Sequence, residues 1–335
     1  MAIHREVVIA ELPQGDLEIS HFELKETERP VAAAPGHVLV RTLLMSIDAA
    51  NRAWMQGATY REAVKAGDVM PTYAVAQVID SADGAFSPGD IVAVEGGWAE
   101  FVEVDARRVQ ALPDVRPLSH LLSVYGVAGK TAYHGLLGVG RPVAGETIVV
   151  SAAAGSVGIF VGQIAKALGC RVVGIAGGAE KCAWVVDALG FDACVDYREG
   201  NLFRALRGVC PEGIDVYFDN VGGQILETVL FQMNLHGRVV CCGAVSQYNA
   251  TAPTGPRNLP GLVVVKRLRM EGFIVMDFAA QDETALAALK GWVDEGKIAV
   301  VEDVIEGLEN APAALVGLLR GDNRGKRMVR VAPDP

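Results

Sequence analysis

The sequence has no cysteine before Cys170 and no Cys-x-x-Cys pair among its six cysteines. A catalytic zinc needs three protein ligands, commonly including thiolates, and a structural zinc often needs four cysteines. The six histidines are scattered and show no His-Glu-x-x-His spacing. We therefore expect no metal site. Disulfide scaffolds are shorter and richer in cysteine, so the six thiols are expected to be free and buried.

A basic surplus is also missing. The chain of 335 residues carries 30 basic and 40 acidic side chains, a formal net charge of −10, which argues against a nucleic-acid partner. The first residues, MAIHREVVIAELPQ, lack the basic, apolar and small-residue regions of a signal peptide. The most apolar tract, 147–169, is interrupted by glycines and by Gln163 and Lys166, so we expect no membrane span and a cytoplasmic protein.

The pattern of the chain changes at about residue 122. Before that point short β-rich runs alternate with turns and no long amphipathic helix intervenes, so a mostly-β domain is predicted. From 123 to 299, strands such as TIVVSA, RVVGIAG, VYFDNV, RVVCCGA and RMEGFIV alternate with helical stretches such as VGIFVGQIAKALG and QILETVLFQMN. This alternation predicts a parallel α/β sheet. The tail, 300–335, is assigned to the first domain.

The strongest local motif is Ala152-x-x-Gly155-x-x-Gly158, which follows an apolar run and opens a helical one. It is a variant of the dinucleotide-binding G-x-G-x-x-G fingerprint with alanine in first place. Gly155 would let the backbone approach a pyrophosphate, and Gly158 would let the helix lie close to the strand. The alternative is a glycine turn that serves packing alone.

The end of the next strand decides the cofactor. An NAD site usually has an acidic residue there, about 20 residues after the glycine motif, to hold the ribose 2′-hydroxyl. This chain has Gly177-Gly178, followed by Glu180 and Lys181. A 2′-phosphate would not be repelled at this strand end and Lys181 could pair with it, so NADP(H) is favoured. The alternative for Lys181 is a solvated lysine at the start of a helix.

Tyr248 follows the strand RVVCCGA, at an end of the sheet where open α/β folds bind ligands. A phenol there can donate a hydrogen bond to a substrate oxygen. The alternative is a partly buried loop tyrosine. The Gly129-Lys130-Thr131 run lacks the first glycine of a P-loop, and no G-x-S-x-G nucleophile elbow occurs.

Taken together, the segments AAAGSVGIFVGQIAKALGCRVVGIAG, YFDNVGG, GRVVCCGAVSQYN, LRMEGFIV and GDNRGK resemble the zinc-independent medium-chain dehydrogenases/reductases. The resemblance is to their leukotriene B4 12-hydroxydehydrogenase, prostaglandin reductase and curcumin reductase group, and it extends from Tyr125 to Lys326. It implies a GroES-like domain, 1–122 with 300–335, and a doubly wound Rossmann NADP-binding domain, 123–299. It also implies NADPH-dependent reduction of the C=C bond of α,β-unsaturated ketones and aldehydes, with Tyr248 stabilising the charge that develops on the substrate oxygen.

The resemblance further implies the cofactor contacts. They are Gly155, Ser156, Val157 and Gly158 at the pyrophosphate, Lys181 and Tyr197 near the adenosine phosphate, and Asn220, Cys242, Gly243, Ala244, Val245, Ser246, Phe273, Ile274, Val275 and Asn323 elsewhere. Two departures stand out: Gly177-Gly178 replaces a hydroxyl residue that the family often has, and SIDAANR lacks the family's proline and tyrosine. Quinone reduction, alcohol oxidation and a non-catalytic NADPH-binding role are the alternatives. A homodimer is expected, because the apolar strand RMEGFIV falls late in the sheet and its edge needs covering.

Overall fold

The computed structural model describes residues 3–252 and 254–335 and divides the chain into two units. Unit 1 holds the residues up to Leu122 together with Glu302–Asp322 and Arg327–Pro335. Unit 2 holds Ser123–Val301 and the short segment Asn323–Lys326. The fold is α/β, with mostly-β structure in unit 1 and a parallel sheet in unit 2, as the sequence predicts.

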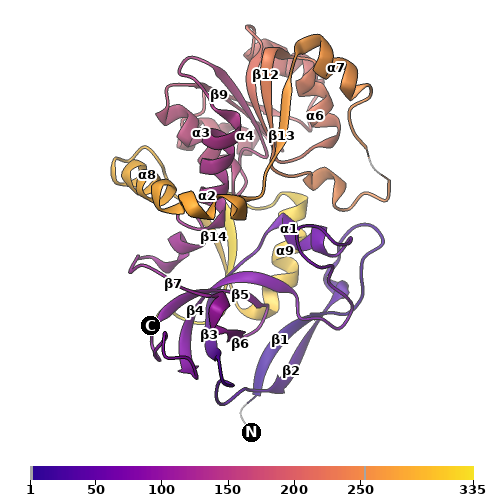
Figure 1. The fold of residues 1–335 in the computed structure, drawn as a ribbon. Helices are drawn as coiled ribbons and strands as arrows, with labels where there is room; N and C mark the ends of the chain where they lie inside the picture. The colour runs from indigo at the N-terminus through magenta and orange to yellow at the C-terminus, as the bar shows by residue number, and fades with distance from the viewer. Residues whose placement is uncertain (1–2, 253) are drawn as a thin grey trace. The chain divides into compact units, whose positions relative to one another are not determined.

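Unit 1 is built on antiparallel strands (Figure 1). Its main sheet has the order β14-β15-β3-β4-β5-β7, with β6 paired to β3, while β1 and β2 form a separate hairpin. The strands are β1 Ile3–Ile9, β2 Phe22–Glu28, β3 His37–Ser46, β4 Pro71–Ser81, β5 Ile91–Gly97, β6 Phe101–Asp105, β7 Val109–Ala111, β14 Glu302–Glu306 and β15 Lys326–Arg330. Two helices accompany them, α1 Ala49–Trp54 and α9 Ala311–Arg320. Ala311, Ala314 and Leu315 share one face of α9, and this face joins the core of the unit.

Unit 2 contains a parallel sheet in the order β10-β9-β8-β11-β12-β13. Its strands are β8 Thr147–Ser151, β9 Arg171–Ala176, β10 Ala193–Asp196, β11 Ile214–Asp219, β12 Met233–Cys241 and β13 Arg269–Gly272. Numbered along the chain this is the 3-2-1-4-5-6 order of the doubly wound fold, whose direction of winding reverses between β8 and β11. The carboxyl ends of these two strands are where such sheets bind ligands.

Helices cover both faces of this sheet. Successive residues of a strand point to opposite faces, and because the residues of β8 are apolar on both faces, each face needs a covering layer. Ile148 and Val150 of β8 belong to one apolar cluster with helices α2, α3, α4 and α8, whereas Val149 belongs to another with α5, α6 and α7. The helices are α2 Val127–Tyr133, α3 Gly158–Ala167, α4 Ala179–Leu189, α5 Leu202–Val209, α6 Gly223–Leu230, α7 Leu259–Lys266 and α8 Asp282–Asp294. A π-helix, His134–Gly140, continues α2.

Four elements differ from the sequence expectation. The helix expected over QILETVLFQMN ends at Leu230, because Met233 already pairs with Ile214 as the first residue of β12. The strand expected over RMEGFIV stops at Gly272, and a 3-10 helix follows over Val275–Gln281. Helices α5 and α7 lie in stretches for which the sequence analysis proposed no element.

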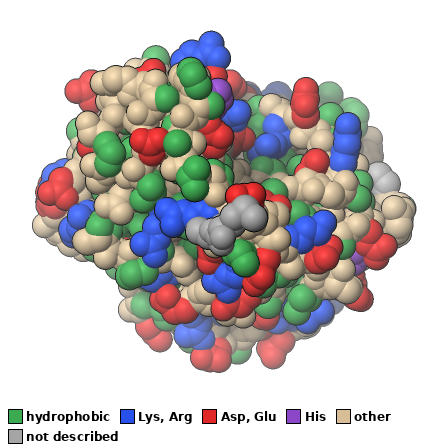
Figure 2. Space-filling view, turned by 90° about the horizontal axis from the view of Figure 1, so that it is seen from below, with side chains coloured by type: hydrophobic (Ala, Val, Ile, Leu, Met, Phe, Trp, Pro, Cys, Tyr) green, Lys and Arg blue, Asp and Glu red, His purple; other side chains and the backbone are tan. Residues whose placement is uncertain are grey.

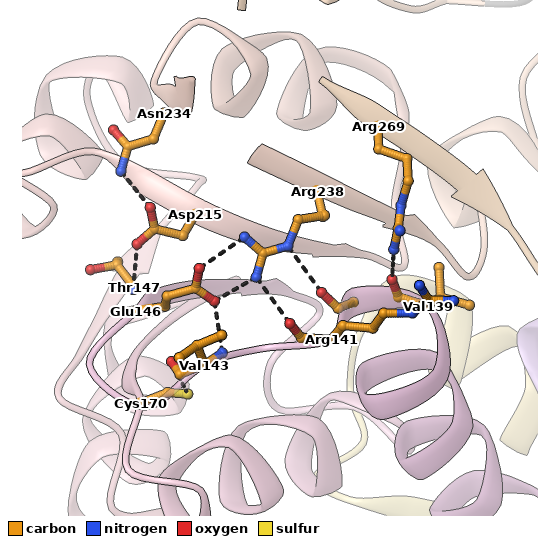
Figure 3. Close-up of polar contacts among 11 residues, drawn as sticks. Val139, Arg141, Val143, Glu146, Thr147, Cys170, Asp215, Asn234, Arg238 and Arg269 are labelled. Carbon is orange, nitrogen blue, oxygen red and sulfur yellow. Dashed lines mark hydrogen bonds and ion pairs between the residues drawn. The ribbon is translucent and has the colours of Figure 1, made fainter. Parts of the chain in front are cut away.

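Two arginines fasten the π-helix to the amino-terminal side of the sheet, as Figure 3 shows. Arg238 of β12 donates to the carbonyls of Gly140 at 3.1 Å and Arg141 at 3.2 Å, and forms a two-pronged ion pair with Glu146. Arg269 of β13 donates to the carbonyl of Val139. Burial alone raises the pKa of Glu146, but hydrogen bonds from Arg238 and from the Val143 N–H outweigh it, and the pKa lies below its ordinary value. The last carbonyls of the π-helix are thus satisfied by side chains from the sheet.

Candidate cofactor and active site

The glycine loop lies directly after β8 and leads into α3, as the motif predicts. A Cβ atom at Gly158 would be only 2.3 Å from the carbonyl oxygen of Ala152, so this position has room for no side chain. Within the described residues, the N–H groups of Ser156, Val157 and Gly158 donate to no acceptor. The loop therefore presents unpaired donors at the start of a helix, which is the arrangement that binds a pyrophosphate.

The segment 323–326 lies beside this loop. The Gly325 N–H donates to the Ala154 carbonyl at 2.9 Å, and Gly155 and Gly325 form a parallel bridge. Asn323 is buried, and its side-chain amide donates to the Gly325 carbonyl at 2.9 Å. Lys181 of α4 donates to the Asn323 carbonyl at 2.6 Å. The structure thus brings Asn323 and Lys181 together, although the Asn323 amide serves the conformation of its own segment.

The carboxyl end of β9 carries Gly177 and Gly178, and Tyr197 lies across from them just after β10. A Cβ atom at Gly177 would be 3.0 Å from Cε1 of Tyr197. The Tyr197 side chain is 44% exposed, so its ring is accessible to a ligand. Lys181 lies in the first turn of α4, the helix that begins right after Gly178.

Buried Asp219, which the sequence analysis did not single out, organises the turn after β11. Its Oδ1 accepts from the Val221 and Gly222 N–H groups at 3.0 and 2.8 Å and from the Tyr217 hydroxyl at 2.8 Å. Burial raises the pKa of Asp219 despite these hydrogen bonds. The sequence signal is an acidic residue at the end of a buried strand, directly before the turn Asn-Val-Gly-Gly, because an aspartate side chain accepts from backbone N–H groups two and three residues on.

Asn220, which the resemblance singled out, is held against the neighbouring strand. Its N–H donates to Ser151 Oγ at 2.9 Å, and its side-chain amide donates to the Ser151 carbonyl at 2.7 Å. The contact joins the carboxyl ends of β8 and β11 where the winding reverses. Asn220 is therefore fixed at the edge that ligands approach in this fold.

The turn after β12 is tied to the same place. The N–H groups of Cys242 and Gly243 donate to the Asp219 carbonyl at 2.9 and 3.1 Å, and Val245 N–H donates to the Asn220 carbonyl at 3.3 Å. Ser246 donates to the Val221 carbonyl through its N–H at 3.1 Å and its hydroxyl at 2.6 Å. Burial raises the pKa of Cys242 to about 12, so this thiol is protonated at neutral pH.

Tyr248 folds back over this turn. Its hydroxyl oxygen accepts a hydrogen bond from the Ala244 N–H at 3.3 Å and would lie 3.5 Å from a Cβ atom at Gly243. Because the oxygen is the acceptor in this bond, the hydroxyl hydrogen remains available as a donor. Burial raises the pKa of Tyr248 above its ordinary value, so the phenol keeps that hydrogen at neutral pH.

The residues after β13 do not continue the strand that the sequence predicts, because β13 ends at Gly272 and a 3-10 helix begins at Val275. The Phe273 ring packs edge-on against Phe218 with ring centroids 6.4 Å apart, and its Cζ would be 2.5 Å from a Cβ atom at Gly135. Its side chain therefore belongs to the packing of unit 2. Ile274 and Val275 follow it, and Val275 begins the 3-10 helix. A cofactor contact at these three residues stays a prediction, as do the contacts predicted for the other positions.

No group of three or more His, Cys, Asp or Glu side chains is placed to hold a metal ion within 3–252 and 254–335. In the same ranges, no helix is both long and apolar enough to span a membrane.

On the face drawn in Figure 2, basic and acidic side chains are interspersed.

Comparison with known proteins shows what this arrangement is similar to. Residues 5–112 match the family described as N-terminal domain of oxidoreductase, and residues 156–290 match the family described as zinc-binding dehydrogenase. NADPH-dependent curcumin reductase of Escherichia coli (strain K12) is 42% identical over 99% of this chain and 98% of its own length. Prostaglandin reductase 1 of Rattus norvegicus is 44% identical over 93% of this chain and 94% of its own length.

The chain belongs to the curcumin reductase and prostaglandin reductase group of medium-chain dehydrogenases/reductases. The crystal structure of CurA from Vibrio vulnificus in complex with NADPH matches with a TM-score of 0.94 and 39% identity, over 98% of this chain and all of that one. The relatives of this reductase group are thus matched across both units. The zinc in the description of one matching family has no counterpart in the donor groups of the described residues.

Proposed function

We propose that this chain is an NADPH-dependent reductase of the C=C bond of α,β-unsaturated ketones and aldehydes. The observation that carries the proposal is Tyr248, a protonated phenol that retains its donor hydrogen at the ligand-binding end of the sheet. The printed activities of the relatives, curcumin reductase and NADP-dependent 2-alkenal reductase, support the same substrate class. A 2-alkenal carries a carbonyl group conjugated with a C=C bond.

The residues of unit 2 fit a dinucleotide. Because Gly158 has no side chain, the loop and the helix can approach each other closely, as a pyrophosphate site requires. The N–H groups of 156–158, which have no acceptor among the described residues, can donate to an anion. We assign Lys181 and Tyr197 to the adenosine phosphate, and Asn220, the turn 242–246, 273–275 and Asn323 to the rest of the cofactor. When bound, NADPH supplies the hydride that the reduction needs. Residues 123–299 would be the NADP-binding domain, and 1–122 with 300–335 the GroES-like substrate domain.

Tyr248 performs the protein's part of the chemistry. Reduction at the β-carbon of an enone places negative charge on the carbonyl oxygen, and the Tyr248 hydroxyl donates a hydrogen bond to that oxygen. The Ala244 N–H steadies the phenol, because it donates to the phenol oxygen. The raised pKa keeps the donor protonated through the neutral range. The α-carbon takes its proton from water.

An NADPH-oxidation screen over enones, enals, quinones and nitroalkenes tests the proposal. We expect turnover of enones and enals, with the product identified as the saturated carbonyl compound. Turnover of quinones alone would make the chain a quinone reductase, and oxidation of alcohols with NADP⁺ without enone reduction would make it an alcohol dehydrogenase. Tight NADPH binding without turnover of any compound would identify a non-catalytic NADPH-binding protein.

We also propose that the protein is a homodimer. Strand β13 is the outer strand of the sheet of unit 2 and pairs only with β12 among the described residues. Exposed apolar side chains lie on the neighbouring helix α7, where Val264 is 71% and Val265 is 66% exposed. An unpaired strand edge beside an apolar surface is a site at which a second copy adds. Light scattering at micromolar concentration should give twice the chain mass, and a monomer would refute this proposal.

A cytoplasmic location is proposed as well. All six cysteines are free, and four of them have their pKa raised to about 11 or higher by burial, which suits unreactive thiols in a reducing compartment. Fractionation of cells that express the chain should place the activity in the cytoplasmic fraction. Recovery from an oxidising compartment would contradict the assignment.

A further inference from the structure

The side chain of Arg198 lies against the backbone of Gly177. A Cβ atom at Gly177 would be 2.8 Å from Nε of Arg198, closer than real Cβ atoms come to other groups, and 3.0 Å from its Cζ. The guanidinium therefore occupies the space that the missing side chain of Gly177 leaves open. Its carbon is also 5.7 Å from the centre of the Tyr197 ring. The two side chains after β10 thus face the glycine turn after β9.

The placement of Arg198 is fixed by its backbone. Asp196 Oδ1 accepts from the N–H of Gly178 at 2.9 Å and from the N–H of Arg198 at 2.9 Å. One carboxylate oxygen thus ties the turn after β9 to the turn after β10. Asp196 uses this oxygen to hold the backbone, rather than standing as a free acid at the strand end.

The charges around this turn favour an anion. Lys181 lies in the first turn of α4, and Arg198 lies across from it beside Gly177. Glu180, the acidic residue of that first helical turn, forms an ion pair with Arg324. The negative charge of Glu180 is therefore offset by that of Arg324, and the strand end carries two further positively charged side chains, Lys181 and Arg198, beside the carboxylate of Asp196.

We infer that Arg198 is a specificity-determining residue that binds the 2′-phosphate of NADPH, and that Gly177 is required because it leaves room for the Arg198 guanidinium. The inference rests on the proposed function, in which NADPH is the cofactor. A guanidinium binds phosphate through two parallel N–H donors, which a serine hydroxyl at position 177 would not supply. Glycine at position 177 thus lacks a hydroxyl donor but leaves room for the two-pronged guanidinium donor of Arg198.

Calorimetric titration with two adenosine nucleotides tests the inference without any turnover. Adenosine 2′,5′-bisphosphate carries the 2′-phosphate, and adenosine 5′-monophosphate lacks it. Arg198→Met should weaken binding of the bisphosphate about tenfold and leave the Kd of the monophosphate within about twofold, since an exposed phosphate contact is partly screened. Arg198→Lys should recover part of the loss. Arg204→Met removes the same charge from an exposed position of α5 and should change neither Kd.

A double-mutant cycle tests the role of Gly177. In Gly177→Ala the new Cβ would meet the mobile end of Arg198 and the Tyr197 ring rather than backbone, so the protein should fold and the guanidinium should move. Gly177→Ala should weaken binding of the bisphosphate about fivefold when Arg198 is present. In the Arg198→Met background the same substitution should weaken it by less than about twofold, because the guanidinium that the new Cβ would displace is then absent.

The possible results separate this inference from the proposed function. If the wild-type protein binds both nucleotides equally, the NADPH assignment itself fails. If the wild-type protein prefers the bisphosphate and Arg198→Met keeps the full preference, the NADPH assignment stands and Arg198 is not its phosphate ligand. Equal effects of Gly177→Ala in both backgrounds would overturn the spatial exchange between Gly177 and Arg198.

Discussion

Substitution of Tyr248 by phenylalanine separates catalysis from binding in this reductase. The change removes one hydroxyl and keeps the ring that packs over the turn after β12. The hydrogen bond that it deletes within the protein, from Ala244 N–H, is 3.3 Å long, beyond the usual 2.7–3.2 Å range. Its loss should therefore cost less than about 1 kcal/mol of unfolding free energy.

The expected loss in rate is much larger. A donor aimed at developing negative charge contributes about 10²–10³ in kcat. Tyr248→Phe should thus lower kcat and kcat/KM for an enone together, while the Kd for NADPH stays nearly constant. Rapid-mixing measurement of NADPH oxidation gives the rates, and NADPH fluorescence gives the Kd. Tyr60→Phe is a matched control for stability, because the Tyr60 oxygen also accepts an N–H, from Trp54, at 3.3 Å.

The pH profile adds an independent readout. Because burial raises the pKa of Tyr248 above its ordinary value near 10, the phenol donor should persist and the rate should stay level through pH 9. Activity of the wild type should fall only at higher pH, and this alkaline fall should be missing from the residual activity of Tyr248→Phe. A wild-type turnover rate in Tyr248→Phe would show that the phenol only lines the site. Collapse of NADPH binding would show that its role is structural.

Three further predictions concern the framework of unit 2. Gly158→Ala places a Cβ atom 2.3 Å from the Ala152 carbonyl oxygen, so thermal unfolding should show a loss of about 2 kcal/mol or more and the Kd for NADPH should rise; unchanged stability would refute the close approach. Arg238→Met removes the two-pronged pair with Glu146 and two carbonyl contacts, and should cost about 3 kcal/mol in denaturant unfolding with little change in the KM for NADPH; a normal midpoint would show that the pair contributes nothing. Burial raises the pKa of Asp219, so the stabilisation linked to its protonated form is present below the unfolded-state pKa of about 4 and is lost as pH rises through the folded-state pKa. The free energy of unfolding of Asp219→Asn should therefore improve relative to that of the wild type from pH 4 to pH 7. A constant difference between the two proteins would contradict the raised pKa.

The parts of this fold that the sequence predicts are those coded by neighbouring residues. The run from Thr147 to Ala167 contains a buried strand, a glycine turn and a helix, and each is specified within a few positions of itself. The steric need for Gly158 is local too, because the atom that excludes a side chain belongs to Ala152. Helix α5 also has a local signal, its N-cap, because the Asn201 side chain accepts from the Arg204 N–H at 3.0 Å.

The parts that escaped the sequence analysis depend on tertiary pairing. Helical periodicity continues through Phe231 and Gln232, but Met233 is drawn into β12 by its pairing with Ile214. The apolar run after Gly272 has strand propensity, yet Phe273 turns into the aromatic packing against Phe218 and the chain enters a 3-10 helix. In both places packing outweighs the local preference that the sequence displays.

The same distinction applies to the individual residues of the site. Lys181 could be proposed from its place in the first turn of a helix, but its direction is set by the Asn323 carbonyl, 142 positions away along the chain. The bond to this carbonyl orients the Lys181 ammonium, a group that can donate to more than one acceptor. Arg198 shows the converse, since nothing in its own neighbourhood of the sequence indicates that it fills the space beside Gly177. A glycine in a fingerprint indicates where a ligand can come close, whereas the side chain that uses the opened space is supplied by the topology of the sheet.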